Sequence, residues 1–566
     1  MAVSANTILE VQTGGSDSAN SGGFDPKNPT FDNTLLSTGV DARNAVCTVG
    51  AGNYNFAAGD VGHWLFIKSG TNWNPGWYKI TSVGGTAATV DAAIGHGISY
   101  PSMTPTTVQG VGTVSAPSSG SWAVDYSQAT STGVPFTWTG TITIGGTTTQ
   151  LTTSGTAWGY NMVGNVINLS GGGATTGFYV VNSYNGTNTV TLNASAGSAG
   201  GSVSGYLGGP FASPGQAGAV TAGGPTFVKS GTYSITSASP NVTGGTFQMS
   251  AGNLQYLEGY QTYRGDLGTP PLLQASGINT FTLVSNTGSN NGYAVTNISV
   301  DGAGLTSSQG FNISRFGRLY KCEVLNCTNN GFNIGGSFGG VLDFCSATGC
   351  STQPAFSVGS GSLYGCEAYS NTITGFASTG TNGSTFAHCL SYNNSGASSD
   401  GFNTSSVTML AGCVAYGNGR SGFRPITTAN QANTLLIDCI GEGNLTANFD
   451  FQSTTVIGAI MHLCASYGGG GHLSGNPGKN IGFITQSAGS FFNNAAGGDF
   501  SLNNTVGQGA LLRGTGFPGI FPAGTTTGYL DVGAAQHQDT GGGGGGGTQQ
   551  AADEGGVLII PGQAWW

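Results

Sequence analysis

The residues of this chain that could do chemistry are carboxylates in its repeated middle part: Glu323, Asp343, Glu367, Asp400, Asp438, Glu442 and Asp450. Glycoside hydrolysis uses two carboxyl groups on either side of one sugar, roughly 5 to 10 Å apart. Two pairs are candidates, Glu323 with Glu367 and Asp438 with Glu442. The alternative is that these are ordinary solvated charges, which are commoner than catalytic pairs.

A second candidate set is a series of tyrosines at one position of a repeated phrase: Tyr369, Tyr392, Tyr416 and Tyr467, with Glu442 at that position before the last. Stacked tyrosines would offer a sugar-binding face, because each ring supplies apolar area and a hydroxyl. The alternative is that the rings only stabilise the turn by stacking on one another. The sequence therefore predicts glycan-binding residues here, with no cofactor.

The repeated phrase that carries these residues is marked by cysteine. Large apolar residues stand three positions before each cysteine, and a phenylalanine follows about ten positions after most of them. Seven cysteines recur with gaps of 21 to 26 residues: Cys322, Cys345, Cys366, Cys389, Cys413, Cys439 and Cys464. Such self-similarity indicates one supersecondary unit that is repeated and stacked.

Each unit is expected to consist of short strands. The apolar residues have no 3.6-residue period, and Gly, Asn and Ser interrupt them every few positions. A leucine-rich repeat has a similar length, but its leucine consensus and helical segment are missing. The pattern predicts an all-β parallel β-helix in which equivalent residues lie about 4.8 Å apart. Glu323 and Glu367 would then be two coils, about 10 Å, apart, whereas Asp438 and Glu442 share one coil.

Several columns should face the interior of this β-helix. Cysteine, leucine and phenylalanine are predicted to stack, and an asparagine column should bond its amides along the axis. Its members, five residues after a cysteine, are Asn371, Asn394, Asn418 and Asn444. Inward cysteines behave as small apolar residues, so we predict free buried thiols, with disulfides as the alternative. The five-residue interval of Cys322 and Cys327 does not suit zinc, and no paired histidines accompany it.

A second repeat lies near the N-terminus. The segment from Asp60, DVGHWLFIKSG, matches the segment from Met162, MVGNVINLSGG, and a further match aligns Tyr78 with Tyr179. Both segments alternate apolar and polar residues, as half-buried strands do. We therefore expect two related β units, residues 1–105 and 106–208, which either form a separate head or extend the β-helix as irregular coils.

Two phrases flank the cysteine repeats: VKSGTY, from Val228, and GYLDVGAAQ, from Gly528. With these phrases the chain resembles the right-handed parallel β-helix proteins of the pectate-lyase-like superfamily over residues 209–536. The resemblance implies the fold but no single activity, because this architecture carries lyases, hydrolases, phage tailspikes and inert adhesins. The tripeptide Gly95-His96-Gly97 matches a polygalacturonase phrase, but it precedes the β-helix and lacks the Arg-x-Lys partner. No catalytic residue of the family therefore carries over.

Composition excludes several classes of partner. Only 6% of the residues are charged, the net charge is −10, and the 13 Lys and Arg are scattered. Nucleic acids and anionic membranes are bound through clustered positive charge, so neither is expected. No apolar stretch is long enough for a membrane span. The N-terminal residues lack the pattern of a secretory signal, so we expect a virion or extracellular protein that is released by a route such as host lysis.

The C-terminal residues 537–566 form a separate segment by composition. A run of seven glycines, Gly541 to Gly547, is a flexible linker. It precedes an apolar tail whose candidate docking residues are Val557, Leu558, Ile559, Ile560, Trp565 and Trp566. Such a tail suits docking into a groove or onto a sheet edge of a partner, and the alternative is a disordered end.

Three functions remain open at this stage. The first is a structural or receptor-binding virion protein, a tailspike-like or capsid-fibre adhesin that binds host surface polysaccharide. The second is a polysaccharide depolymerase, either hydrolase or lyase, on the same scaffold. The third is a bacterial surface adhesin or filament subunit. An open β-helix needs its ends covered, so a homo-oligomer such as a trimer is also expected.

Overall fold

The computed structural model describes residues 3–516 and 531–535, apart from gaps of which the longest are 38–45, 93–116, 129–135, 427–433 and 452–458. The chain divides into two compact units. The first comprises residues 1–233, 241–245 and 255–257, and the second comprises the remainder. The C-terminal docking residues and the glycine linker lie outside the described residues, so the tail stays a prediction.

The first unit contains two closed barrels of six strands each. The first barrel is formed by β3 (Asp32–Ser37), β4 (Val46–Thr48), β5 (Trp64–Thr71), β6 (Gly76–Gly84), β7 (Ala87–Val90) and β8 (Ser118–Asp125). The second is formed by β9 (Phe136–Gly145), β10 (Thr148–Thr152), β11 (Val166–Ser170), β12 (Gly177–Tyr184), β13 (Thr189–Leu192) and β14 (Ser202–Leu207). The orders β3-β4-β7-β6-β5-β8 and β9-β10-β13-β12-β11-β14 correspond strand for strand, so the N-terminal region is built from two related units, as predicted.

The duplication extends to details of backbone conformation. Gly62 and Gly164 both adopt positive φ, +89° and +91°, after short 3-10 turns, η1 (Ala58–Asp60) and η2 (Tyr160–Met162). Tyr78 and Tyr179 each donate a hydroxyl hydrogen bond to the carbonyl four residues earlier, at 2.6 and 2.8 Å. The first barrel extends beyond residue 105, where the sequence interpretation ends the first unit, because β8 (Ser118–Asp125) belongs to this barrel. β8 pairs with β3 and β5, and it lies outside the matched segments that set the boundary.

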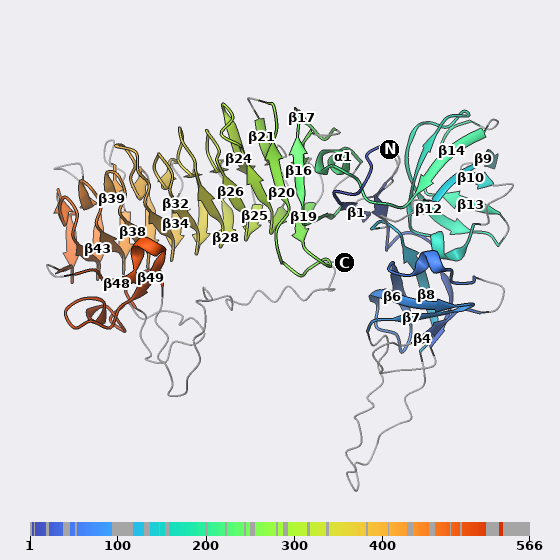
Figure 1. The fold of residues 1–566 in the computed structure, drawn as a ribbon, viewed down its shortest axis with the longest axis horizontal. Helices are drawn as coiled ribbons and strands as arrows, with labels where there is room; N and C mark the ends of the chain where they lie inside the picture. The colour runs from blue at the N-terminus through green and yellow to red at the C-terminus, as the bar shows by residue number, and fades with distance from the viewer. Residues whose placement is uncertain are drawn as a thin grey trace, which may run out of the picture. The chain divides into compact units, whose positions relative to one another are not determined.

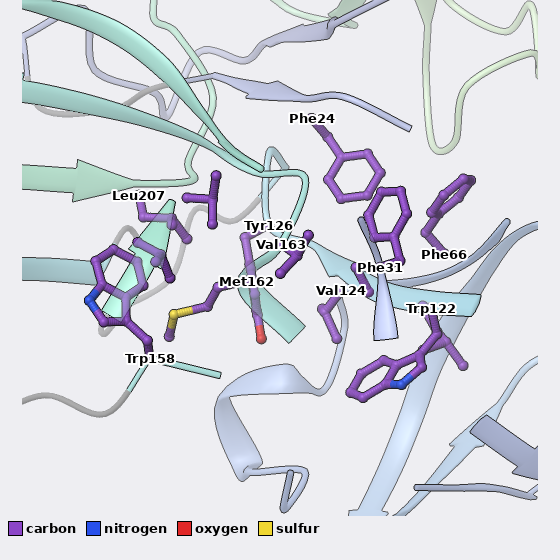
Figure 2. Close-up of a cluster of buried hydrophobic side chains, with 14 of the residues drawn as sticks. Phe24, Phe31, Phe66, Trp122, Val124, Tyr126, Trp158, Met162, Val163 and Leu207 are labelled. Atoms are coloured by element: carbon purple, nitrogen blue, oxygen red, sulfur yellow. The ribbon is translucent and has the colours of Figure 1, made fainter. Parts of the chain in front are cut away.

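The two barrels share one hydrophobic core (Figure 2), to which Trp122 and Leu207 contribute from different barrels. A polar centre lies within it. The Asp60 carboxylate accepts hydrogen bonds from the hydroxyls of Tyr126, at 2.5 Å, and Tyr54, at 2.7 Å. Tyr126 is fully buried, and its hydroxyl both donates to this carboxylate and accepts from the Asn161 side-chain amide at 2.5 Å.

Further elements of the first unit precede or follow the barrels. β1 (Ile8–Val11) pairs antiparallel with β2 (Gly23–Phe24) and parallel with β15 (Thr226–Lys229). A short helix, α1 (Pro214–Val220), lies between the second barrel and β15. The chain passes between the units through β16 (Thr232–Ile235), β17 (Ser237–Pro240), β18 (Gly245–Met249) and β19 (Gln255–Tyr260). In the part of the chain that the structure describes, no helix is long and apolar enough to cross a membrane.

The second unit is a parallel β-helix whose strands stack into three sheets (Figure 1). Sheet 1 contains β22 (Tyr293–Thr296), β25 (Gly317–Tyr320), β28 (Gly340–Asp343), β31 (Gly361–Tyr364), β34 (Ser384–Ala387), β37 (Thr408–Ala411), β40 (Thr434–Ile437), β43 (Ile460–His462) and β46 (Lys479–Ile481). Sheet 2 contains β20 (Leu272–Ala275), β23 (Ser299–Asp301), β26 (Glu323–Leu325), β29 (Ser346–Thr348), β32 (Glu367–Tyr369), β35 (Leu390–Tyr392), β38 (Val414–Tyr416), β41 (Ile440–Glu442), β44 (Ala465–Tyr467) and β47 (Ile484–Gln486). Sheet 3 contains β21 (Phe281–Asn286), β24 (Ser308–Ile313), β27 (Phe332–Ile334), β30 (Phe356–Val358), β33 (Phe376–Ser378), β36 (Phe402–Thr404), β39 (Ser421–Pro425), β42 (Ala447–Asp450) and β45 (Leu473–Ser474). The predicted all-β class and parallel β-helix are confirmed.

The inner columns are those that the repeat predicted. Phe332 and Phe356 stack with ring centroids 4.7 Å apart, and the same contact continues along sheet 3. The amide nitrogens of Asn371, Asn394 and Asn418 each donate to the amide oxygen of the next asparagine in the column, at 2.8 to 2.9 Å. All ten cysteines are free and buried. The predicted phenylalanine stack, asparagine ladder and buried thiols are therefore confirmed.

Residues with a left-handed backbone conformation (positive φ) lie at two corners of each coil. The residue before each column cysteine has positive φ whether or not it is glycine, as at Phe344 (+54°) and His388 (+52°). The residue before each asparagine also has positive φ, as at Ser370 (+53°) and Asn393 (+53°). Non-glycine residues rarely adopt this conformation, so their repetition reflects a constraint of the fold.

The last coil differs from the others at its inward positions. Asn480 is in register with Met461, and Thr485 is in register with Ser466. Met461 and Ser466 are buried, whereas Asn480 and Thr485 are exposed. The chain then forms β48 (Phe492–Asn494), η3 (Ala495–Gly497), β49 (Asp499–Leu502) and η4 (Gly509–Leu511). Residues 490–516 and 531–535, here called the C-terminal cover, pack on sheet 2 through a small apolar core that includes Phe491 and Val532.

Candidate glycan-binding face

The candidate site lies on the outer face of sheet 2, where side chains of the first and third strand positions point away from the interior. The first position directly follows each cysteine. Along the β-helix it is occupied by Glu323, Ser346, Glu367, Leu390, Val414, Ile440 and Ala465. This outer column is thus polar in its N-terminal half and apolar in its C-terminal half. The C-terminal cover packs on the apolar half, against Val414, Ile440 and Ala465.

The polar half holds the acidic pair that the sequence singled out. Glu323 is in register with Ser346, and Ser346 with Glu367, so the two glutamates share one column two strands, about 10 Å, apart. Ser299 donates its hydroxyl to the Glu323 carboxylate at 2.8 Å. Burial is the main cause that raises the pKa of the Glu367 carboxyl. A proton is therefore held more firmly on Glu367 than on a solvated glutamate.

Tyr369 adjoins this pair at the third strand position. Burial raises the pKa of its phenol, with further contributions from the Glu323 and Glu367 charges. Its ring stacks on Tyr392 with centroids 5.2 Å apart and an interplanar angle of 9°. Both glutamates and Tyr369 are half-buried. The three side chains thus form one patch of the outer face that combines carboxylates with an aromatic ring.

The other predicted tyrosines are engaged by the C-terminal cover. Phe500 of β49 contacts Tyr392 at 4.9 Å and Tyr416 at 5.8 Å between ring centroids. Tyr467 contacts Phe491 at 6.2 Å. Four tyrosines do form a column, but the cover packs on three of them, so the column is not one continuous bare face. The sequence did not reveal this, because the covering residues are distant in the chain and have no repeat.

Asp438 and Glu442, the second candidate pair of carboxylates, are both buried. Asp438 is a left-handed corner residue with φ +54° and is 5% exposed. Glu442 lies in β41 and is 3% exposed, and its carboxylate accepts a hydrogen bond from the Phe491 backbone at 3.0 Å. Burial raises its pKa, although this hydrogen bond opposes the shift. Residues of one coil turn to different faces, so spacing along the chain did not bring these carboxylates onto one surface.

The corner of sheets 1 and 2 carries a row of aromatic side chains that the repeat alignment did not predict. Tyr320 contacts Phe344, Phe344 contacts Tyr364, and Tyr364 contacts His388, with ring centroids 5.4 to 6.1 Å apart and near-perpendicular planes. All four side chains are half-buried. They occupy the one or two positions before each cysteine, so an alignment that examined these positions would have found them.

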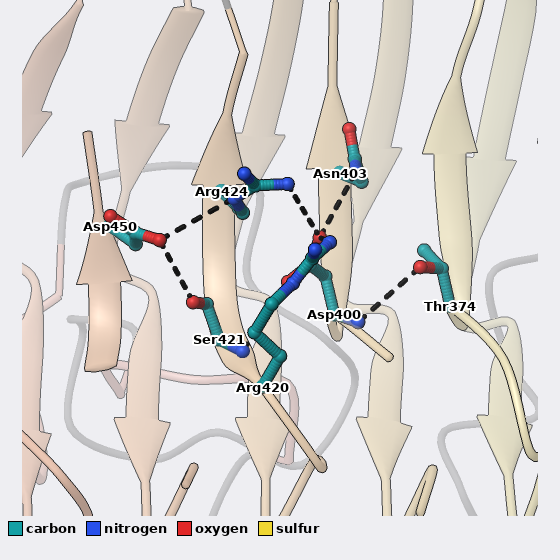
Figure 3. Close-up of polar contacts among 7 residues, drawn as sticks. All are labelled: Thr374, Asp400, Asn403, Arg420, Ser421, Arg424 and Asp450. Atoms are coloured by element: carbon teal, nitrogen blue, oxygen red, sulfur yellow. Dashed lines mark hydrogen bonds and ion pairs between the residues drawn. The ribbon is translucent and has the colours of Figure 1, made fainter. Parts of the chain in front are cut away.

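An ionic network on sheet 3 was also missed (Figure 3). Asp400 is fully buried and forms ion pairs with Arg420 and Arg424. The Arg420 Nε donates to the Asp400 Oδ1 at 2.7 Å, and Arg424 reaches Asp450 at 3.4 Å. Asp400 and Asp450 had been considered only as surface carboxylates. Their charges are matched by two arginines, and so they serve packing rather than an open site.

The described residues contain no group of three or more potential ligands suited to a metal ion. The N-terminal half of the outer column of sheet 2 carries the carboxylates of Glu323 and Glu367 and the hydroxyl of Ser346, and Tyr369 follows in the strand of Glu367. These groups can form hydrogen bonds with a hydroxylated ligand.

Comparisons with known proteins found similar solved structures but no similar sequence. No family model and no curated protein sequence matches it. Among solved structures, a pectate lyase aligns with a TM-score of 0.38 and 14% identity, covering 58% of this chain and 92% of its own. A mannuronan C-5 epimerase A-module of Azotobacter vinelandii aligns with a TM-score of 0.31 and 15% identity, covering 48% and 89%. A tailspike protein of Pseudomonas phage LKA1 aligns with a TM-score of 0.24 and 11% identity, covering 62% and 60%.

The class of protein follows from the strand register within this chain. It is a parallel β-helix protein, with a duplicated β-barrel earlier in the chain, as the sequence predicted. A fold alone does not determine an activity, so a function has to be argued from the residues of the candidate face.

Proposed function

We propose that this protein is a tailspike-like or capsid-fibre adhesin that binds surface polysaccharide through the patch of Glu323, Glu367 and Tyr369. The observation that carries the proposal is the division of the outer face of sheet 2. Its apolar half lies under the C-terminal cover, whereas the polar half keeps two half-buried carboxylates beside an aromatic ring. A location on a virion or extracellular surface and a homo-oligomeric, trimeric state belong to the same proposal.

The patch offers the interactions that a sugar requires. A pyranose has an apolar ring face, which packs on an aromatic ring, and peripheral hydroxyls, which donate to carboxylates. Tyr369 supplies the ring, and Glu323 and Glu367 supply acceptors on one side of it. Half-burial of these groups lowers the cost of ordering them on binding. The low charge of the chain gives no comparable support to a nucleic acid or an anionic membrane as ligand.

Substitution of the aromatic ring tests the proposal. We expect Tyr369→Ala to weaken glycan binding by about fivefold to tenfold, since a ring contact contributes about 1 kcal/mol. The measurement is a glycan array followed by titration with the best oligosaccharide. Tyr263→Ala is the matched control, because Tyr263 is 55% exposed and lies in a loop after β19. Equal affinity of the two variants for every bound glycan would reject the patch as the binding site.

A second candidate function, a polysaccharide hydrolase, is favoured by one observation, the raised pKa of Glu367 beside a second carboxylate in the same column. In this mechanism Glu367 protonates the glycosidic oxygen of the leaving sugar. Glu323 accepts a proton from the water that attacks the anomeric carbon. A separation near 10 Å leaves room for this water and so corresponds to inversion of configuration. A surface adhesin or filament subunit of a bacterium remains the third possibility.

The hydrolase candidate makes a separate prediction. Glu367→Gln should lower the rate of reducing-sugar release by roughly 10²- to 10⁴-fold, measured at saturating polysaccharide. The wild-type rate should fall as pH rises through the raised pKa of Glu367, because only the protonated form donates. Unchanged release by the variant would exclude Glu367 as the acid. Absence of release by the wild type from every polysaccharide that it binds would leave the adhesin as the function.

A further inference from the structure

The thiol column of the β-helix has a property that is independent of the glycan-binding face. Its seven members are each at most 1% exposed, and all are free. Each thiol donates to the backbone carbonyl two residues earlier, at 3.4 to 3.6 Å. Most also reach a carbonyl of the preceding coil, as Cys413 does to Phe386 at 3.4 Å. The S–H groups therefore serve as hydrogen-bond donors at the corner of sheets 1 and 2, in addition to filling space.

Neighbouring thiols of the column lie within the range in which disulfides form. The strands on both sides of each cysteine are in register from coil to coil, as Tyr320 with Asp343 and Glu323 with Ser346. Consecutive column cysteines are thus separated by one strand spacing, about 4.8 Å, inside the usual Cα range for a disulfide. A disulfide here would consume two S–H donors and leave their carbonyl acceptors without them.

Burial protects these thiols once the chain has folded. It raises the pKa of Cys345, Cys366 and Cys413 well above the usual range, so the reactive thiolate is scarce at these three positions, and the 0–1% exposure of the column keeps reagents away from all seven. The unfolded chain has no such protection. Its ten cysteines are then accessible, and even eight cysteines allow on the order of a hundred complete pairings. Pairing of column cysteines in the unfolded chain would fix segments of several coils in loops that cannot wind into the β-helix.

We propose that this chain folds to its native state only in a reducing compartment and leaves that compartment already folded, with the thiol column intact. In oxidising surroundings two thiols of the unfolded chain react with a disulfide such as oxidised glutathione. The products are one protein disulfide and two reduced glutathione molecules, and each protein thiol gives up its proton and one electron. This route suits a protein that is assembled inside a cell and acts outside it. It opposes export of an unfolded chain into an oxidising space.

Refolding at two redox poises tests the proposal. The full chain is denatured with reductant and diluted into buffer with either reduced or oxidised glutathione. We expect the native yield to be lower in oxidised glutathione by about tenfold or more, and dithiothreitol to restore it. Alkylation with intact-mass measurement should find ten free thiols in the native protein, before and after a day in oxidised glutathione. Equal yields at the two poises would overturn the proposal, as would loss of thiols from the native protein.

Two further outcomes separate oxidation from other causes. If the species formed in oxidised glutathione holds no disulfides, or if reductant does not rescue it, aggregation and not pairing is responsible and the proposal fails. Cys47→Ala is the matched control, since Cys47 is buried in the first barrel, outside the column. This variant should keep the same ratio of yields. If it removes the difference between the poises, the column is not the determinant.

Discussion

Asp400→Ala is expected to destabilise the β-helix unit by about 3–5 kcal/mol. Asp400 is fully buried, whereas its partners Arg420 and Arg424 keep 25% and 13% of their side-chain surface. Removing the carboxylate leaves the Arg420 guanidinium without its ion-pair partner and leaves Arg424 with Asp450 alone, in a poorly solvated place. The loss arises from these uncompensated charges more than from the attraction that disappears. Equilibrium denaturation, followed in the transition of the second unit, measures it.

The matched control is the ion pair of Asp343 and Arg318. Its N–O distance is 2.8 Å, but the Arg318 side chain is 41% exposed. Asp343→Ala should therefore change the free energy of unfolding by about 0–1 kcal/mol, as is usual for surface pairs. Adding salt should reduce this small effect and leave the Asp400→Ala effect nearly unchanged, since buried pairs are screened less. Similar losses for the two variants would mean that the Asp400 network behaves as a surface network.

The interior of the β-helix could be predicted from the sequence because stacking imposes the same requirement on every coil. A residue at the Cys366 or Phe376 position packs on residues of the same type in the coils before and after it. The residue type therefore recurs once per coil, and this period can be seen in the sequence. The outer positions meet different surroundings from coil to coil. Glu367 and Ile440 occupy equivalent positions, yet one lies beside a second carboxylate and the other lies under the C-terminal cover. The repeat pattern does not indicate such differences in the surroundings of the outer residues.

The candidate site was accordingly predictable only in part. The shared column of Glu323 and Glu367 followed from the coil period, and the register agrees with it. The engagement of Tyr392 by Phe500 depends on a contact between residues more than a hundred positions apart. The change from polar to apolar residues directly after the cysteines indicates in the sequence that another segment covers this part of the sheet. Exposed apolar residues in one column of a sheet require something to cover them.

The asparagine ladder accounts for the regular turn after sheet 2. Each asparagine follows a left-handed residue, which turns its side chain inward where water cannot reach it. Its amide then replaces water for the backbone of two coils: Asn418 donates to the Ser391 carbonyl at 3.0 Å and accepts from the Asn394 backbone at 3.3 Å. Asn448 continues the ladder from a different position and bonds Asn444 at 2.8 Å. The ladder is thus a set of buried polar groups that satisfy one another.

Asn418→Ala is therefore expected to destabilise the β-helix unit by about 3–5 kcal/mol, because each buried group left without a partner costs about 1–3 kcal/mol. The groups that lose a hydrogen bond are the Ser391 carbonyl, the backbone and side-chain amides of Asn394, and the side-chain oxygen of Asn444. Asn333→Ala is the matched control. Asn333 also bonds an asparagine of the neighbouring coil, Asn312 at 3.3 Å, but on the half-exposed outer face of sheet 3. Water can replace that bond, so the control should lose less than about 1 kcal/mol. Denaturant titration of both variants compares the two losses, and equal values would show that the ladder contributes no more than a surface amide pair.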